Sequence, residues 1–234
     1  MNKPTQLIFP FQINQKASFD SFFCSPDNLN LMTKLADIAL SNNAQELIIH
    51  GEKGSGKSFL MQAFCNELSL AGKQFAFIPM NKALKMEVEI FQNLASLDTV
   101  CIDDLQLMLS NESWETALFN LINECQQSNC SLILSFGGNQ PLEENTQLPD
   151  LLSRIKRMEF ITLHAVQDEF FNQAINFVAE QLDISIDKAE LEFLLKHQTR
   201  RFSLLVENII TLDKQAASLK RKITIPLIKE TLNL

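Results

Sequence analysis

The stretch GEKGSGKS, from Gly51 to Ser58, constrains the fold of this chain more than any other part of the sequence. It matches the phosphate-binding pattern G-x-x-x-x-G-K-[ST] at every required position. It also stands between QELIIH, an apolar run typical of a buried strand, and a run with the apolar spacing of a helix. Strand, loop and helix in this order predict a nucleotide-binding core; the alternative is an ordinary glycine turn before a helix.

Each residue type in this loop has a chemical reason. Glycines allow the backbone to curl so that successive N–H groups face phosphate oxygens. Lys57 supplies a positive charge to the β- and γ-phosphates, the Ser58 hydroxyl completes the coordination of Mg²⁺, and the following helix adds the positive end of its dipole. The predicted nucleotide-binding residues are Gly51, Gly54, Ser55, Gly56, Lys57, Ser58 and Phe59.

A pair of carboxylates, Asp103 and Asp104, ends the apolar run TVCIDD. We expect Asp103 to hold Mg²⁺ with Ser58, directly or through water, and Asp104 to orient or deprotonate an attacking water. Strand ends often carry solvated acids, so the pair by itself indicates little. Its position about one crossover downstream of the phosphate loop favours the catalytic interpretation.

Strand and helix patterns alternate as far as about residue 163, after which only amphipathic helices follow. This alternation predicts right-handed crossovers and a parallel sheet covered on both faces. We therefore expect an α/β fold with a small C-terminal helical domain, divided into an N-terminal arm (1–28), a nucleotide-binding core (29–165) and the helical domain (166–234). The predicted strands are 45–51, 75–79, 99–103, 131–136 and 160–163, and the predicted helices are 29–40, 58–71, 84–95, 113–127, 148–156, 167–182, 187–198, 202–219 and 225–232.

The charge balance argues against duplex DNA as the main partner. Lys and Arg number 20 against 28 Asp and Glu, a formal net charge of -8 that repels phosphate backbones. We therefore expect no sequence-specific duplex binding. No apolar run approaches the roughly 20 residues that span a bilayer, and the N-terminus has no secretory signal. We expect no membrane partner and a cytoplasmic protein.

Several motifs together resemble the DnaA-related AAA+ proteins. They are the phosphate loop, VCIDD, ESWETALFNLIN, LPDLLSRI and the terminal RKITIPLIKETLNL. We expect neither an initiator-type N-terminal domain nor a C-terminal helix-turn-helix beside the helical domain, so within this family the sequence is most similar to the DnaA-homologous regulatory inactivators. The resemblance implies an AAA+ core with a helical lid, ADP or ATP with Mg²⁺ as ligand, and ATP-bound DnaA as partner. It leaves a homo-oligomer open.

The resemblance also assigns roles to arginines. Arg154, in LPDLLSRI, matches the arginine-finger position and would reach into the ATP site of DnaA. Taken alone, one arginine near a helix end is usually a solvated surface charge. A lid arginine that contacts nucleotide is matched by Arg200 or Arg201, whereas Asn208 falls where initiators tend to place theirs.

AAA+ proteins carry a polar sensor residue at the end of the strand inserted between the phosphate-loop strand and the carboxylate strand. The run 131–136 occupies that place, and Ser135 or Asn139 could serve as the sensor. Gly137 and Gly138 stand where the resemblance leads us to expect a polar side chain. A strand followed by a flexible turn is the competing interpretation.

The stretch Gln6-Leu7-Ile8-Phe9-Pro10 places large apolar residues almost at the N-terminus. It is similar to the short motif Gln-Leu-x-Leu-Pro with which the regulatory inactivators bind the DNA polymerase III sliding clamp, the β subunit, although Phe9 replaces the usual leucine. The resemblance implies that the clamp buries these residues. The alternative is an edge strand that pins the arm to the core.

Together these interpretations give one functional hypothesis. The protein binds nucleotide and clamp, stimulates hydrolysis of DnaA-bound ATP, hydrolyses ATP only weakly itself, and so prevents re-initiation of replication. Three rivals remain: a stand-alone AAA+ ATPase, a helicase-loader-like module that grips single-stranded DNA through the basic clusters at 154–157 and 220–222, and a clamp adaptor without catalytic effect.

Overall fold

The computed structural model describes residues 11–138, 141–197 and 201–234. Its contacts divide the chain into two compact units, Met1–Leu163 and His164–Leu234, which we name the core domain and the helical domain. We expected this boundary between residues 165 and 166. Each domain has its own apolar core.

The core domain is built on one five-stranded parallel sheet with the strand order β2-β3-β4-β1-β5. The predicted parallel sheet is therefore confirmed. Because β4 lies between β3 and β1, the carboxyl ends of these three strands are neighbours at one edge of the sheet. The strands are β1 (Glu46–His50), β2 (Phe75–Pro79), β3 (Thr99–Asp103), β4 (Ser131–Phe136) and β5 (Glu159–Thr162).

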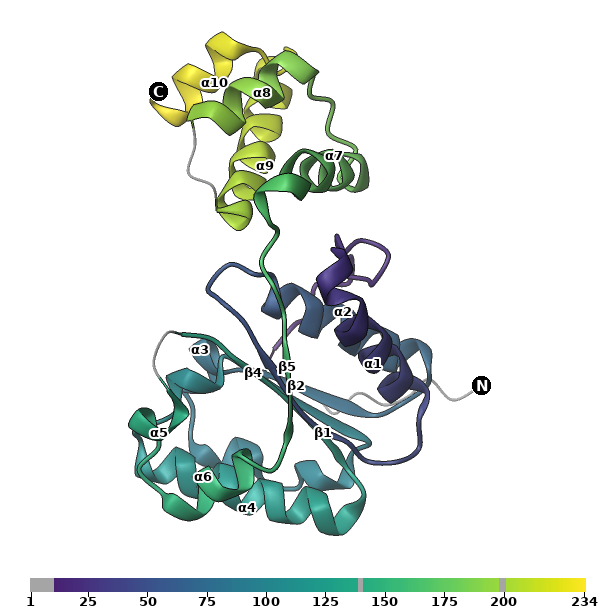
Figure 1. The fold of residues 1–234 in the computed structure, drawn as a ribbon, viewed down its shortest axis with the longest axis vertical. Helices are drawn as coiled ribbons and strands as arrows, with labels where there is room; N and C mark the ends of the chain where they lie inside the picture. Colours follow the sequence, from purple (N-terminus) through teal and green to yellow (C-terminus); the bar gives the residue numbers. More distant parts are fainter. Residues whose placement is uncertain (1–10, 139–140, 198–200) are drawn as a thin grey trace. The chain divides into compact units, whose positions relative to one another are not determined.

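Helices cover both faces of this sheet (Figure 1). On one face lie α1 (Leu29–Leu40) and α2 (Lys57–Leu70), and on the other α4 (Glu112–Ser128) with α6 (Pro149–Ile155). The interior strands are apolar at nearly every position because each face meets a helix layer. Side chains alternate between the layers: Ile48 belongs to the cluster that includes α4, and its neighbours in β1 to the cluster that includes α1 and α2.

The described part of the predicted N-terminal arm packs on the core domain. Phe11 and Ala17 are buried, with exposed fractions of 5% and 1%. The Asn66 side-chain amide, on α2, donates hydrogen bonds to the carbonyl oxygens of Asn14 (3.0 Å) and Ala17 (2.6 Å). Within the span predicted as an arm, the chain therefore contacts α2 from about residue 14.

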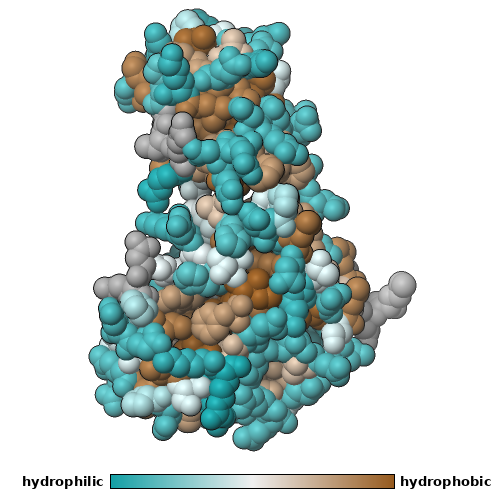
Figure 2. All heavy atoms as spheres, viewed as in Figure 1, coloured by the Kyte–Doolittle hydropathy of each residue, from teal (hydrophilic) through white to brown (hydrophobic). Residues whose placement is uncertain are grey.

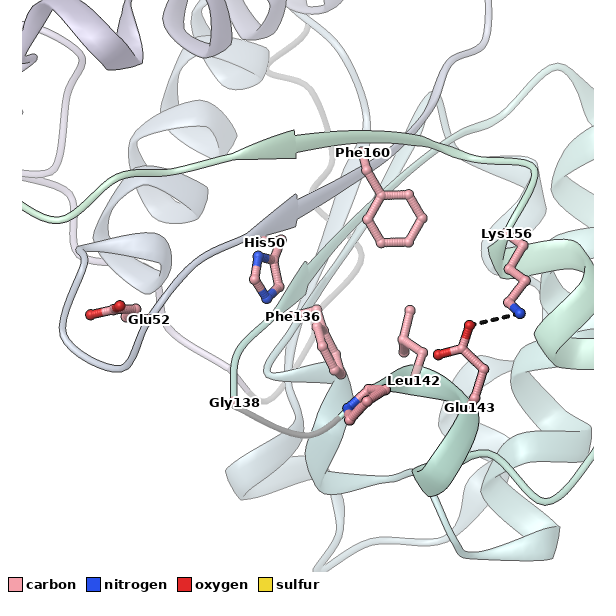
Figure 3. Close-up of a pocket in the computed structure, with 9 residues that line it drawn as sticks. His50, Glu52, Phe136, Gly138, Leu142, Glu143, Lys156 and Phe160 are labelled. Carbon is pink, nitrogen blue, oxygen red and sulfur yellow. Dashed lines mark ion pairs between the residues drawn. The ribbon is translucent and has the colours of Figure 1, made fainter.

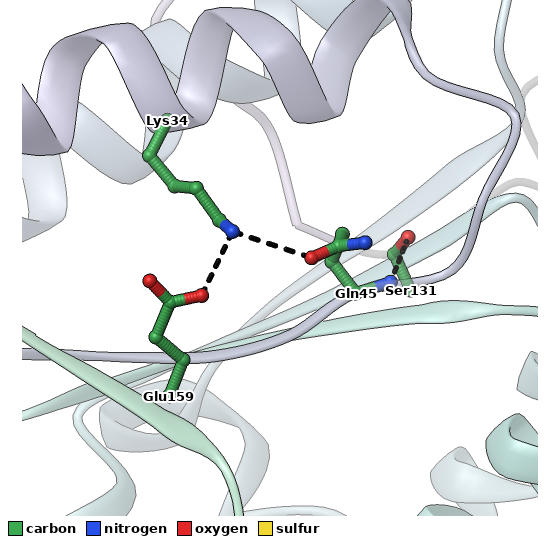
Figure 4. A network of polar contacts seen from close by, with 4 residues as sticks. All are labelled: Lys34, Gln45, Ser131 and Glu159. Carbon is green, nitrogen blue, oxygen red and sulfur yellow. Dashed lines mark hydrogen bonds and ion pairs between the residues drawn. The ribbon is translucent and has the colours of Figure 1, made fainter.

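A polar network ties α1 to the amino ends of three strands (Figure 4). Lys34 Nζ lies 2.8 Å from Glu159 Oε2 and donates a 3.3 Å hydrogen bond to Gln45 Oε1, while the Gln45 N–H donates to Ser131 Oγ at 3.1 Å. Partly exposed ion pairs contribute little to stability, so the main effect of this network is to fix the position of α1. It lies at the end of the sheet opposite the phosphate loop.

The helix predicted for 84–95 is wrong. In its place the chain forms two 3-10 turns, Val88–Phe91 and Leu94–Ser96, and the short helix α3 (Met80–Ala83) ends just before this segment. Asn93, between the two turns, has φ 61°, a left-handed conformation that ends a helix and that asparagine tolerates. Apolar residues every three positions satisfy a 3-10 turn as well as an α-helix, so the apolar spacing alone did not separate the two.

The helical domain contains α7 to α10 around its own core. None of its described residues forms a strand, and no described helix of the chain is long and apolar enough to cross a membrane. A short helix between β4 and α6, α5 (Leu142–Asn145), was not predicted. The bounds in the helical domain are α7 (Phe171–Gln181), α8 (Lys188–His197), α9 (Phe202–Leu219) and α10 (Ile225–Leu232).

Candidate functional site

The phosphate loop joins β1 to α2 and depends on its glycines. Gly54 (φ 87°) and Gly56 (φ 98°) both adopt the left-handed backbone that favours glycine. A Cβ at Gly56 would also stand 3.1 Å from the ring of Phe22, which stacks at 6.3 Å on the ring of the predicted site residue Phe59. Gly56 directly precedes α2, and the first N–H groups of a helix have no acceptor within the helix. Those N–H groups are available to phosphate oxygens.

Gly51 is required for a different reason, namely lack of space. A Cβ at this position would lie 2.6 Å from the carbonyl oxygen of Leu163 and 2.8 Å from Ser55 Oγ. Leu163 is held in place because its N–H donates a 2.7 Å hydrogen bond to the carbonyl of His50. Ser55 Oγ is buried and has no hydrogen-bond partner in the described part of the chain. The loop therefore starts in a closely packed position.

We predict that Gly51→Ala destabilises the core domain. The added methyl group meets backbone, which cannot rotate away, and overpacking of this kind lowers the free energy of unfolding by about 1–3 kcal/mol. Urea denaturation measures this directly. Lys53→Ala, at an exposed position of the same loop, is the control and should unfold at the wild-type midpoint. Equal midpoints for all three proteins would contradict the packing argument.

Lys57 points into the phosphate loop. Its Nζ donates hydrogen bonds to the carbonyl oxygens of Gly51 (2.7 Å) and Glu52 (2.8 Å). Burial lowers the pKa of the Lys57 ammonium, and the negative charges of Asp104 and Asp103 act in the opposite direction. The loop thus holds one buried ammonium group next to the two carboxylates at the end of β3. This ammonium group is the donor that a phosphate-binding loop is expected to supply.

Asp103 lies at the end of β3 with an exposed fraction of 3%. Its Oδ1 accepts a 2.5 Å hydrogen bond from Ser135 Oγ, and the Ser58 side chain lies close to this carboxylate. Burial raises the pKa of Asp103, while the hydroxyl groups of Ser135 and Ser58 lower it. A hydroxyl and a carboxylate side by side are oxygen ligands of the kind that Mg²⁺ binds, so the residues present fit this ion.

A glutamine that the sequence analysis missed links the end of β3 to the end of β4. Gln106 Nε2 donates to Asp104 Oδ1 at 2.8 Å, and Gln106 Oε1 accepts from the Gly137 N–H at 2.8 Å. The Asp104 N–H in turn donates to Ser135 Oγ at 2.9 Å. Gln106 thereby supplies a polar side chain next to the glycines that follow β4. Its place two residues after Asp104 was the only signal in the sequence.

The predicted residues fall into separate groups. The structure brings Lys57, Ser58, Asp103 and Asp104 together at the carboxyl ends of the strands and adds Ser135 to them. Arg154 is outside this group. The predicted residues Asn139 and Arg200 lie outside the described residues, as do Gln6, Leu7, Ile8, Phe9 and Pro10, while Arg201 is exposed and directly precedes α9.

Arg154 lies in the last turn of α6 and is partly exposed. Leu151 and Ile155 of the same helix are fully buried in the apolar cluster that contains α4, so the helix itself is firmly packed. Within the described residues, the Arg154 guanidinium forms no ion pair. Arg154 is thus a cation without an ion-pair partner among the described residues, and it lies on a helix that is packed against the core domain.

A cavity of about 680 Å³ lies on the face of the sheet that α5 and α6 border (Figure 3). The rings of His50 and Phe136 stack there at 5.7 Å, and Phe160 on the edge strand is 45% exposed. Figure 2 shows apolar side chains gathered over this part of the sheet, where β4 and β5 lie. Lys156 and Glu143 form a 2.7 Å ion pair at its border. Glu52 of the phosphate loop and His50 directly before it line this cavity, which therefore borders the loop, although none of the predicted nucleotide-binding residues lines it.

Comparisons with known proteins agree with this architecture. A family model of the bacterial DnaA ATPase domain matches residues 13–159, and a model described as Hda, lid domain, matches residues 168–232. Among solved structures, domain III of the replication initiation protein DnaA from Thermotoga maritima is similar over 95% of this chain and 98% of that chain, with a TM-score of 0.80 and 18% identity.

Two further structures show the same fold. AMPPCP-bound DnaA from Aquifex aeolicus matches 89% of this chain and 69% of that chain, with a TM-score of 0.70 and 20% identity. The Holliday junction branch migration motor RuvB from Thermotoga maritima matches 93% of this chain and 71% of that chain, with a TM-score of 0.63 and 17% identity. Because the DnaA ATPase model spans more than half of the sequence, the chain belongs to the DnaA family of AAA+ proteins and carries a C-terminal lid domain of the Hda type.

Proposed function

We propose that this protein is a regulatory inactivator of DnaA that stimulates hydrolysis of DnaA-bound ATP through Arg154. The observation that carries the proposal is the Arg154 guanidinium, which has no ion pair among the described residues and stands on a packed helix in a DnaA-family chain. In this role the protein converts the initiator to its ADP form, and replication does not start again prematurely.

The proposed chemistry needs only one positive charge in the correct place. Phosphoryl transfer spreads negative charge over the oxygens of the transferred group, and a guanidinium fixed beside them stabilises the transition state. The Arg154 fork can donate two parallel hydrogen bonds to such oxygens, which a lysine cannot do. In this role Arg154 acts on the ATP of the partner and not on nucleotide in its own phosphate loop.

The phosphate loop of this chain is proposed to bind ADP or ATP. Lys57 and the first N–H groups of α2 would hold the phosphates, and Ser58 with Asp103 would hold Mg²⁺, which neutralises phosphate charge when bound. The A. aeolicus relative was solved with AMPPCP, which supports an adenine nucleotide. Because Gln106 holds the Asp104 carboxylate, and because AAA+ sites need an arginine from a neighbour, we propose that hydrolysis by the isolated chain is slow.

The experiment that tests this function is phosphate release from two samples. In the first, the isolated protein is incubated with ATP; in the second, ATP-loaded DnaA is added together with clamp on DNA. The proposal expects little phosphate from the first sample and rapid release from the second. Turnover near 10 s⁻¹ in the first sample, a typical enzyme rate, would favour a stand-alone ATPase instead.

The N-terminal stretch is proposed to bind the sliding clamp. Burial of Leu7 and Phe9 in a partner's pocket would contribute roughly 1.5–3 kcal/mol each, less the entropy cost of association. We therefore predict a dissociation constant on the order of 1 μM for the clamp, equivalent to about −8 kcal/mol. Gln6→Ala/Leu7→Ala should abolish clamp binding and stimulation of DnaA while nucleotide binding stays at the wild-type level.

The control for this prediction is Lys3→Ala/Thr5→Ala in the same segment, which should bind the clamp normally. Clamp binding by pull-down and a melting curve are measured side by side for both variants. If Gln6→Ala/Leu7→Ala still binds the clamp but melts at a lower temperature, the stretch stabilises the fold and the clamp proposal is wrong.

A further inference from the structure

Glu115 is a buried carboxylate that the proposed chemistry does not use. It lies in the first turn of α4 with an exposed fraction of 0%. Its Oε1 accepts hydrogen bonds from the N–H groups of Ser110 (2.7 Å) and Gln147 (3.0 Å), and its Oε2 from those of Gln147 (3.0 Å) and Leu148 (2.7 Å). Among the described residues it forms no ion pair.

Burying a carboxylate is unfavourable unless several donors satisfy it. Here every donor is backbone, so Glu115 fixes the course of the chain and not the rotamer of another side chain. Two further bonds close the same network: Ser110 Oγ donates to the Asn145 carbonyl at 2.8 Å, and Gln147 Nε2 donates to the Ser110 carbonyl at 3.2 Å. The carboxylate thus ties the segment before α4 to the segment before α6.

The segment that Glu115 holds leads directly into the helix of Arg154. Leu148 immediately precedes α6, and no side chain caps this helix at its N-terminus. A helix of 7 residues has little stability of its own, because nucleation costs more than so few turns return. Leu151 and Ile155 pack the side of α6 against the core, and the bonds at its amino end fix where the chain enters this packing. At the amino end, the N–H bonds to Glu115 take this role; α4 and α6 lie next to each other in Figure 1.

We infer that Glu115 is a positioning residue for Arg154: by anchoring the start of α6 to α4, it sets the direction in which the guanidinium leaves the core domain. This inference rests on the proposed function of Arg154. A misplacement of about 1 Å between a catalytic group and its substrate can lower a rate roughly 100-fold. Glu115 acts through backbone and does not touch the ATP of the partner.

The test is Glu115→Gln, which keeps the size of the side chain but replaces one acceptor oxygen by an NH₂ group that faces N–H donors. With the full-length variant at saturating concentration, we expect the single-turnover rate of hydrolysis of DnaA-bound ATP to fall about 100-fold. Hydrogen exchange at the Gln147 and Leu148 amides should become faster. Affinity for ADP in the variant's own phosphate loop should stay at the wild-type value.

Two variants on α4 separate positioning from general loss of stability. Glu112→Gln changes an exposed carboxylate of the same first turn and should leave every readout unchanged. Ile122→Val removes one buried methylene from the same helix and should lower the melting temperature without slowing DnaA hydrolysis or exposing the Gln147 and Leu148 amides. If the rate of hydrolysis of DnaA-bound ATP falls in Ile122→Val in proportion to the decrease in its melting temperature, the positioning role is overturned.

If Glu115→Gln does not fold, Glu115→Asp is tested in its place. It keeps the carboxylate charge but shortens the side chain by one methylene. A folded Glu115→Gln or Glu115→Asp that stimulates at the wild-type rate would overturn the inference. Arg154→Ala is run in parallel to separate the positioning role of Glu115 from the proposed function of Arg154. If Arg154→Ala is inactive while the Glu115 variants are fully active, only the positioning role fails; if Arg154→Ala is fully active, the proposed function fails with it.

Discussion

Arg154→Ala is expected to abolish the stimulation of DnaA, with a loss of roughly 10³–10⁵ in the stimulated rate, the range that arginine fingers supply. The physical reason is that alanine removes the charge that would stabilise the phosphoryl transition state and leaves nothing in its place. The measurement is the rate of hydrolysis of DnaA-bound ATP with wild-type and variant protein at equal, saturating concentrations.

Folding should not change in this variant, because the Arg154 side chain forms no ion pair within the described residues. Its melting temperature and its clamp binding should match the wild type. Arg157→Ala provides a matched control, since it removes an exposed arginine three positions further along the chain. Normal stimulation by Arg154→Ala would show that the finger assignment is wrong and would favour a clamp adaptor.

Lys57→Ala is expected to weaken nucleotide binding by roughly 10- to 150-fold. This range follows from a charge-assisted hydrogen bond of about 1.5–3 kcal/mol and from a factor of ten in affinity for about 1.4 kcal/mol. Lys57 is the buried ammonium group of the phosphate loop, so no neighbouring lysine replaces it. Titration with fluorescently labelled ADP measures the affinity.

Lys53→Ala is the control for this prediction, because Lys53 is an exposed lysine of the same loop. It should bind labelled ADP as the wild type does. A melting curve in the absence of nucleotide checks that Lys57→Ala is folded. If folded Lys57→Ala binds ADP with wild-type affinity, the loop is not the nucleotide site.

The parts of the fold that could be predicted from the sequence are those in which a local pattern of apolar residues repeats along the chain. Each interior strand is apolar because both of its faces are covered, and each long helix repeats its apolar residues with the period of its buried side. The ends of α1, α9 and α10 were predicted at the observed residues for this reason. The loop glycines were predictable because a phosphate loop requires them at fixed spacing.

The parts that the sequence did not predict depend on contacts between distant segments. The turns that replace the helix predicted for 84–95 pack on α4, which no local pattern reveals. Gln106 and Glu115 look like ordinary polar residues of a turn and a helix until the fold brings Gly137 and Leu148 beside them. Likewise, the packing of residues 11–28 on the core domain follows from partners on α2, such as Asn66.

The most direct test of the proposed function is a single-turnover measurement on the partner. DnaA is loaded with radiolabelled ATP, unbound nucleotide is removed, and the conversion of bound ATP to ADP is followed with and without this protein and DNA-loaded clamp. We predict rapid conversion when both are present and slow conversion when either is omitted. Identical conversion of DnaA-bound ATP with and without this protein, at saturating concentration and with loaded clamp, would contradict its proposed role as a regulatory inactivator.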